Sequence, residues 1–407
     1  MERATTATAE RGLSDLVHGS RVVVCLGPGG VGKTTSAAAI AVAAALAGKR
    51  VAVLTVDPAA RLKDALELPR DPGRLHRVPL PEGATGTLDA ILLDAKGLFD
   101  GLVRRLSPSP ALAERVLANP VYRNVAGAFA GSDAYMALEQ LLDIVRDEDF
   151  DLVVVDTPPA SHALELFDAP ERILALLDSR ALEYLGEPVR ILGAASSRLA
   201  RSLLSAVLAG LERMTGLSLL RDISTLATDF SVVSPEFKKR AQAIRDLLRA
   251  ADTRYVLLAA PDPHATTDIL NFATEVHRAG VSIDAVIVNR VLQDGVATPR
   301  SAHGIDARPP TSEGATPPKT ARWPSHLARN LVACARDLAT LRAAQQEVIE
   351  RLREGLATLP GGKAAPRDEE RVWVLLPALS PAPTTLEGIV ALARALGVAG
   401  PRSTSAA

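Results

Sequence analysis

Short apolar runs alternate with longer helical segments along most of this 407-residue chain. Within each run the apolar residues are continuous, which is typical of parallel strands buried on both faces. The predicted strands are Arg21–Leu26, Val51–Thr55, Leu88–Asp94, Leu152–Asp156, Tyr255–Ala260, Asp284–Asn289 and Arg371–Leu375. Helices between successive strands would cover both faces of such a sheet. The pattern therefore predicts an α/β fold with a doubly wound, mostly parallel sheet, in one domain spanning residues 1–407.

Three stretches interrupt the alternation. Residues 97–147 and 164–250 have helical spacing throughout, so we expect them to form a helical subdomain at the carboxyl ends of the strands. Residues 293–324 are rich in Pro, Gly, Ser and Thr and predict a flexible insertion without chemistry. The stretch from Val189 to Leu211 is apolar but contains three arginines, which argues against a transmembrane segment.

Composition narrows the possible classes of function. The formal net charge is −1 at pH 7, so the chain lacks the basic balance typical of nucleic-acid-binding proteins. The two cysteines have no metal-ligand spacing and predict no disulfide framework. The N-terminal segment has no apolar run of the secretory type, and we therefore expect a cytoplasmic protein.

The most informative motif follows the first predicted strand. Residues 27–35 read Gly-Pro-Gly-Gly-Val-Gly-Lys-Thr-Thr and match the phosphate-binding P-loop, between a strand and an Ala-rich helix. Glycines let backbone N–H groups surround phosphate oxygens, and the helix N-terminus adds the positive end of its dipole. We expect Lys33 to contact the β- and γ-phosphates and Thr34 to bind Mg²⁺. The predicted nucleotide-binding residues here are Gly29, Gly30, Val31, Gly32, Lys33, Thr34 and Thr35.

Polar residues at the ends of three further strands extend the candidate site. Asp156 ends an apolar strand, where P-loop enzymes place the carboxylate that supports Mg²⁺; the alternative is an Asp that caps the next turn. Asp57 follows the strand after the P-loop helix and is the candidate to orient the attacking water. Asn289 has an amide whose donor and acceptor suit the edge of adenine, although Asn after a strand is also common in turns.

In this order, the motifs resemble those of the family of arsenite-pump ATPases and tail-anchored-protein targeting ATPases. The family's P-loop, G-K-G-G-V-G-K-T, is similar to residues 27–34. Its first switch, D-P-A-H-S-L-S-D, is similar to residues 57–64, and its second switch, D-T-A-P-T-G-H-T-L-R, to residues 156–165. The resemblance implies a Mg²⁺-dependent ATPase that works as a dimer, with nucleotide near the subunit interface. It also implies that Asn289 contacts adenine, together with a late loop that includes Pro377.

Two features depart from the family pattern. The family's signature lysine, which crosses the dimer interface, is replaced by Pro28. Because proline has neither a charge nor an N–H group, we expect slow hydrolysis unless Arg61 or a lysine-bearing partner subunit supplies the cation. The C-x-x-C pair of the zinc site in many members is absent, and two cysteines cannot form the three-thiolate site of arsenite-binding members.

Three functions stay open at this point. The first is an ATPase that cycles as a homodimer, or as a heterodimer with a paralogue in which it is the weakly active subunit. Apolar residues between Leu199 and Met214 could hold a hydrophobic protein client, or could simply pack the subdomain. The second is the energy-coupling subunit of an anion exporter, which the missing thiols disfavour. The third is a nucleotide-dependent switch or scaffold of the MinD and ParA type, which the lack of a basic face or amphipathic tail disfavours.

Overall fold

The structure of the protein is a computed structural model. It describes residues 12–56, 62–63, 66, 68–69, 73–123, 133–147, 149–178, 217–292, 325–359, 371–379 and 383–397. The predicted insertion at 293–324 and the apolar stretch at 189–211 lie outside these residues, as does the proposed client segment between Leu199 and Met214.

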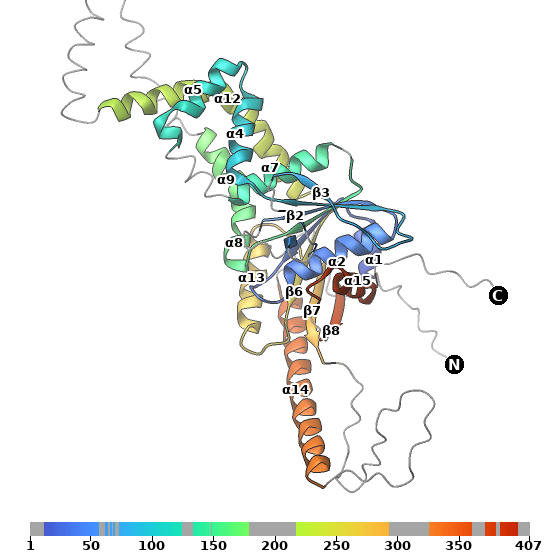
Figure 1. Ribbon diagram of the computed structural model, residues 1–407. Coiled ribbons are helices and arrows are strands. Elements are labelled where there is room, and N and C mark those ends of the chain that lie inside the picture. The colour runs from blue at the N-terminus through green and yellow to red at the C-terminus, as the bar shows by residue number, and fades with distance from the viewer. Residues whose placement is uncertain are drawn as a thin grey trace, which may run out of the picture.

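A single eight-stranded sheet organises the described part of the chain (Figure 1). The strands are β1 (Val22–Leu26), β2 (Arg50–Thr55), β3 (Leu75–Arg77), β4 (Thr87–Leu92), β5 (Leu152–Asp156), β6 (Thr253–Ala259), β7 (Ala285–Val291) and β8 (Val372–Pro377). Their order is β3-β4-β2-β5-β1-β6-β7-β8, and every pair is parallel except β3 and β4. The expected α/β class with a mostly parallel sheet is confirmed. The edge strand β3 was not expected, because three residues are too short to show a pattern.

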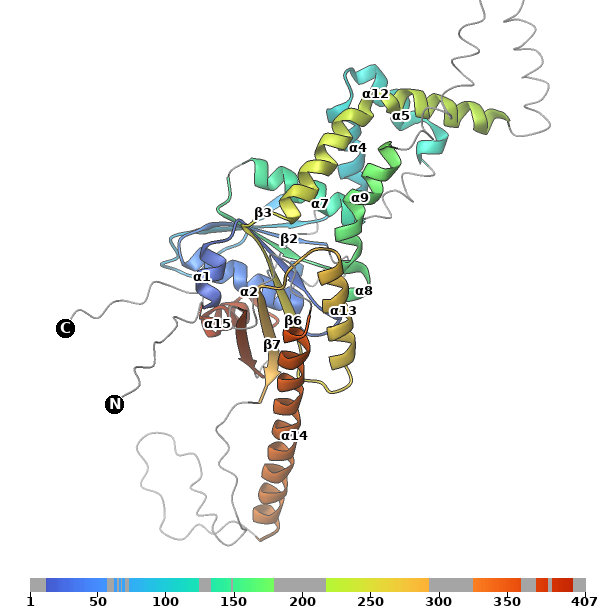
Figure 2. The same ribbon diagram turned by 180° about the vertical axis from the view of Figure 1, so that it is seen from behind.

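Helices cover both faces of this sheet (Figures 1 and 2). On one face lie α1 (Leu13–His18), α2 (Lys33–Leu46) and α15 (Leu386–Ala395). On the other lie α7 (Asp133–Arg146), α9 (Glu165–Asp178), α12 (Leu217–Leu248), α13 (Thr266–Arg278) and α14 (Ser325–Ala357). In β1, Val23 and Cys25 face the first group, while Val22, Val24 and Leu26 face the second. Burial on both faces explains why the strand sequences are continuously apolar.

Helix α2 holds the P-loop in place because its surroundings bury it almost completely. Residues 36–45 of this helix are all buried, between the sheet and α15. Most of them are alanine, which has the highest helix propensity and lets the helix approach its neighbours closely. The start of α2 is thereby fixed relative to the ends of the central strands.

The two segments that were expected to be helical contain helices wherever they are described. Helices α4 (Ala95–Leu106), α5 (Pro110–Ala118) and α7 follow β4, and α8 (Ala160–Ala163), α9 and α12 follow β5. Figures 1 and 2 show α4, α5, α9 and α12 extending together away from the sheet. We call these four helices and α7 the helical layer. No helix within the described ranges is both long and apolar enough to cross a membrane.

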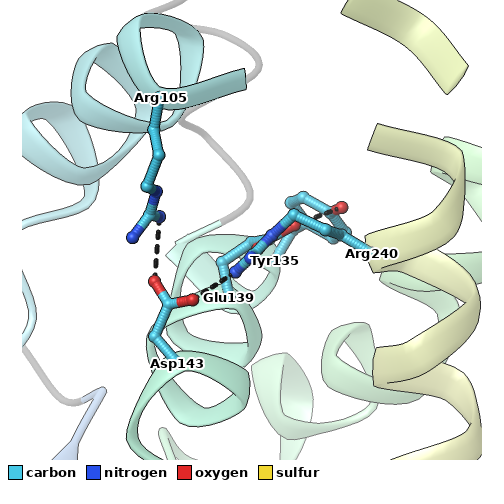
Figure 3. Close-up of polar contacts among 5 residues, drawn as sticks. All are labelled: Arg105, Tyr135, Glu139, Asp143 and Arg240. Atoms are coloured by element: carbon cyan, nitrogen blue, oxygen red, sulfur yellow. Dashed lines mark hydrogen bonds and ion pairs between the residues drawn. The ribbon is translucent and has the colours of Figure 1, made fainter. Parts of the chain in front are cut away.

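A buried ionic network joins three helices of this layer (Figure 3). Arg240 of α12 donates to Glu139 at 2.6 Å and to Asp143 at 2.5 Å, both on α7. Asp143 also pairs with Arg105 of α4 at 2.8 Å, and the hydroxyl of Tyr135 donates to Glu139 at 2.7 Å. Glu139 is only 2% exposed, so its charge depends on these partners rather than on water. The network fixes how α4, α7 and α12 pack together.

Helix α14 is the largest element that the sequence analysis did not anticipate. Its C-terminal half packs against α13 and β7, and the rest continues away from the sheet (Figures 1 and 2).

Candidate active site

The P-loop connects β1 to α2 and depends on two glycines with positive φ. Gly27 has a φ of 145°, and a Cβ there would lie 2.3 Å from the carbonyl oxygen of Leu258 on β6. Gly32, the N-cap of α2, has a φ of 95°, and a Cβ there would lie 2.5 Å from the amide nitrogen of Asn289. Both positions therefore require glycine. Because the loop turns directly into a helix N-terminus, free N–H groups and the helix dipole favour an anion here.

Lys33 begins α2 and folds back over the loop. Its Nζ donates a hydrogen bond of 2.8 Å to the carbonyl oxygen of Pro28, and the residue is 7% exposed. Thr34 and Thr35 follow in the first turn, which contains no acidic residue. The backbone carbonyl holds this amino group next to the loop, where a phosphate oxygen could take over from that carbonyl as acceptor.

Asp156 lies at the end of β5, which is the neighbour of both β1 and β2. The residue is completely buried, and its Oδ2 accepts a hydrogen bond of 3.0 Å from the hydroxyl of Thr55 at the end of β2. The N-cap of the following helix α8 is Pro159, so Asp156 does not cap that helix. The structure thus places the carboxylate one strand away from the P-loop, as expected for a metal-supporting acid in this fold.

Thr157 ties the second switch to the P-loop strand. Its hydroxyl donates a hydrogen bond of 2.6 Å to the carbonyl oxygen of Cys25, and both residues are buried. Burial raises the pKa of the Cys25 thiol well above its usual range; Asp156 acts in the same direction and Lys33 in the opposite one. A protonated, inaccessible thiol is neither a nucleophile nor a metal ligand, so Cys25 is a core residue.

Asn289 lies directly against the P-loop. Its Nδ2 donates a hydrogen bond of 2.9 Å to the carbonyl oxygen of Val31, and its Oδ1 accepts one of 2.9 Å from the N–H group of Arg290. The side chain therefore joins β7 to the loop. Since a primary amide carries two N–H groups and Val31 accepts one of them, a second remains for a base.

A bulge follows the predicted base-contacting residue. Arg290 has a φ of 66°, in the left-handed region that disfavours residues other than glycine, and the pairing of β7 with β8 shifts register here. Gln345 of α14 spans the bulge. Its Oε1 accepts from the N–H group of Leu292 at 2.9 Å, and its Nε2 donates to the carbonyl oxygen of Arg290 at 3.4 Å. Helix α14 is thereby bonded to the segment that positions the candidate base contact.

Pro377 ends β8 beside the same bulge. It pairs with Val291, and the N–H group of Ala378 donates 3.0 Å to the carbonyl oxygen of Val291. Because β7 and β8 are neighbours, Asn289 and Pro377 end up at one edge of the sheet although they are far apart in sequence.

The first switch, residues 57–64, is described only at Leu62, which is buried, and Lys63. Asp57 and Arg61 lie outside the described residues. Strand β2, which leads to this switch, ends at Thr55, and Thr55 pairs in register with Asp156. Pro28 is described, and it contributes a carbonyl oxygen to Lys33 and no charge.

The donor set fits Mg²⁺ bound together with a nucleotide. The hydroxyl of Thr34 and the carboxylate of Asp156 are oxygen ligands, which Mg²⁺ prefers, and such sites use one or two protein ligands plus phosphates. Within the described ranges, no group of three His, Cys, Asp or Glu side chains is arranged to hold a metal ion by itself. Gly30 has a φ of 79°, and a Cβ built on it would have no atom within 4 Å. The space beside this residue is therefore open to a phosphate.

Sequence reasoning missed three supporting residues: Thr55, Thr157 and Gln345. Each acts on a partner that is distant in sequence, from 53 residues for Leu292 and Gln345 to 132 for Cys25 and Thr157. For Thr55 and Thr157, the sequence shows only that a threonine lies at the end of a strand. It does not show which strands are neighbours, and Gln345 carries no such signal.

The family of anion-transporting ATPases matches residues 20–307. A homologue of the ATPase ASNA1 from Trypanosoma cruzi is 24% identical over 309 residues, which cover 69% of this chain and 77% of that protein. A putative arsenical pump-driving ATPase from Halobacterium salinarum is 30% identical over 181 residues, covering 41% and 26% of the two chains. The ATPase GET3 from Malassezia globosa is 27% identical over 149 residues, covering 36% and 42%.

The matched region contains the P-loop, both switches and Asn289, so it includes nearly all of the candidate site. The chain spans less than two thirds of the length of the last two relatives. The match to the family covers well over half of the chain, and it agrees with the resemblance and with the ATPase class that the motifs indicated. The chain belongs to the anion-transporting ATPase family.

Proposed function

We propose that this protein binds ATP with Mg²⁺ at the P-loop and hydrolyses it to drive a conformational change. One observation carries the proposal: a buried Lys33 lies over a loop that needs glycine at two positions, and the buried Asp156 ends the strand next to the one that leads into this loop. This arrangement concentrates N–H donors and positive charge at one point and places an oxygen ligand next to it.

Each residue would have a defined role in the reaction. The N–H groups of residues 29–35 and the ammonium of Lys33 bind and orient the phosphates. Thr34 and Asp156 would hold Mg²⁺, which would neutralise charge on the phosphate oxygens. Asp57 orients water for in-line attack on the γ-phosphorus, as the bond to the ADP oxygen breaks. Asn289 and Pro377 contact the adenine.

The contacts of the second switch support the helical layer as the part that moves. Asp156 and Thr157 lead within a few residues into α8 and α9, and α9 packs against α7 and α12. Loss of the γ-phosphate would release contacts at the end of β5, and the change would pass into these helices.

A dimer is the proposed working unit. Pro28 offers no cation to a partner's phosphates, so turnover would be slow in a homodimer and faster beside a lysine-bearing paralogue. A hydrophobic protein segment is the cargo that we favour over arsenite, because the chain has two cysteines and Cys25 is buried.

Steady-state ATP hydrolysis and direct nucleotide binding, measured side by side, test the proposal. Lys33→Ala should lose ATP binding, whereas Asp57→Asn should bind ATP and fail to hydrolyse it. Lys239→Ala, on the exposed surface of α12, is the matched control and should behave like the wild type. Unchanged turnover in Asp57→Asn would remove its assigned role, and unchanged binding in Lys33→Ala would refute the site.

A further inference from the structure

Helix α14 carries a seven-residue apolar repeat along its length. Positions spaced alternately by three and four residues are apolar apart from Gln345, which is the a and d pattern of a coiled coil with one polar interruption. The a positions are Leu331, Leu338, Gln345 and Leu352, and the d positions are Leu327, Cys334, Leu341 and Val348. We call this row the α14 seam.

The two halves of the α14 seam have different environments. In the C-terminal half, Val348 and Leu352 are buried in the core beneath the sheet. In the N-terminal half, Leu331 is 41% exposed and Leu341 is 52% exposed, and Cys334 is also exposed. Figures 1 and 2 show this half continuing away from the sheet and from the helices packed on it. In this half of the seam Leu327 and Leu338 are half-buried, and beside it Val332 and Ala335 are buried. The fold therefore buries the C-terminal half of the seam and leaves Leu331, Cys334 and Leu341 exposed in the N-terminal half.

We propose that the exposed half of the α14 seam, Leu327–Leu341, pairs with the same segment of a second copy as a parallel coiled coil. A continuous apolar row at heptad spacing is self-complementary when two copies run side by side. The segment is about 21 Å long at 1.5 Å per residue. This inference rests on the proposed dimer and deepens it by naming a contact outside the nucleotide site.

Charges beside the seam favour the parallel orientation. Asp337 occupies a g position and Arg342 the e position five residues later. In a parallel pair, the g residue of one helix lies next to the e residue of the following heptad on the other, so Asp337 faces Arg342 of the second copy twice per dimer. In an antiparallel pair, g positions lie next to g positions. The exposed half has only Asn330 and Asp337 at g, so this orientation forms no g–g pair of opposite charges.

A coil of this length is short, so we expect it to associate weakly on its own and to add to the contacts at the nucleotide site. Cys334 provides a direct probe, because in-register parallel helices bring each d residue opposite its own copy. Cys25 is buried and does not compete.

The experiment is mild oxidation of the full-length protein with copper phenanthroline, followed by non-reducing electrophoresis, with and without a non-hydrolysable ATP analogue. We expect a covalent dimer under both conditions, lost in Cys334→Ser. The matched control is Cys334→Ser/Ala343→Cys, which moves the thiol to an exposed f position on the opposite side of the helix and should give little dimer.

The charge pair gives a second readout. Asp337→Arg should lower the cross-linked fraction, and Asp337→Arg/Arg342→Asp should restore it. Absence of a dimer, a dimer only with nucleotide, or equal cross-linking through Ala343→Cys would each overturn the proposal. Because Lys33→Ala should leave cross-linking intact, failure of the seam and failure of the ATP site are distinguishable.

Discussion

Replacing Arg240 by methionine should strongly destabilise the helical layer. The variant keeps the apolar stem of the side chain and removes the cation that pairs with Glu139 and Asp143. Asp143 retains Arg105, but Glu139, at 2% exposure, keeps only the hydroxyl of Tyr135. Breaking a buried pair by removing one partner costs about 3–5 kcal/mol, because the remaining charge is buried without compensation.

The loss should depend on pH in a direction that the structure fixes. Burial raises the pKa of Glu139 above its ordinary 4.5, and Arg240 opposes that rise. Without Arg240 the pKa rises further, so the folded state binds this proton more tightly than the unfolded state. Stability from such a group is present below its unfolded pKa and is lost as pH rises through the folded pKa. The deficit of Arg240→Met should therefore be small in acid and grow toward neutral pH.

Urea denaturation followed by far-UV circular dichroism, at mildly acidic and at neutral pH, measures this effect. Arg240→Met/Glu139→Gln should recover most of the loss at neutral pH, because a neutral amide can still accept from Tyr135. Arg115→Met is the matched control: it removes an arginine that pairs with Asp229 in the same helical layer, but in an exposed position, and should cost far less. The reasoning would be refuted if Arg240→Met had a free energy of unfolding as high as that of this control. It would also be refuted if its loss of stability were the same at both pH values.

Three further predictions concern the nucleotide site. Gly32→Ala should abolish binding of a fluorescent ATP analogue, since its Cβ would lie 2.5 Å from Asn289 at a φ of 95°; wild-type affinity would contradict the assigned loop geometry. Pro28→Lys should raise steady-state ATP turnover at least tenfold if a cation acting across the dimer is what the chain lacks, and no change would locate the cation elsewhere. Gln345→Met should weaken ATP binding and reduce the preference for ATP over GTP, with kcat little changed. Adding Arg290→Gly should restore the binding, because glycine accepts a φ of 66° without support; no rescue would separate Gln345 from the base contact.

The sequence by itself determined the strands and the phosphate loop, because their signals are local. Continuous apolar runs reveal strands buried on both faces, and all seven predicted strands are present. A strand, a loop of glycines around Lys33 and an Ala-rich helix form one contiguous unit, so its motif can be recognised without knowing what packs against it. The sequence also predicted that Asp156 ends a strand, but it did not predict the contact of Asp156 with Thr55.

Only the tertiary structure decided which residues contact the P-loop and Asp156, because no local sequence pattern determines the order of the strands in the sheet. Asp156 meets Thr55 because β5 lies between β1 and β2, and Asn289 meets the P-loop because β6 alone separates β7 from β1. Gln345 reaches the bulge, and Arg240 reaches two acids of α7, only because helices from distant parts of the chain pack together. The sequence alone does not show these contacts. Local sequence sets what a segment can become, and long-range packing sets which polar groups meet.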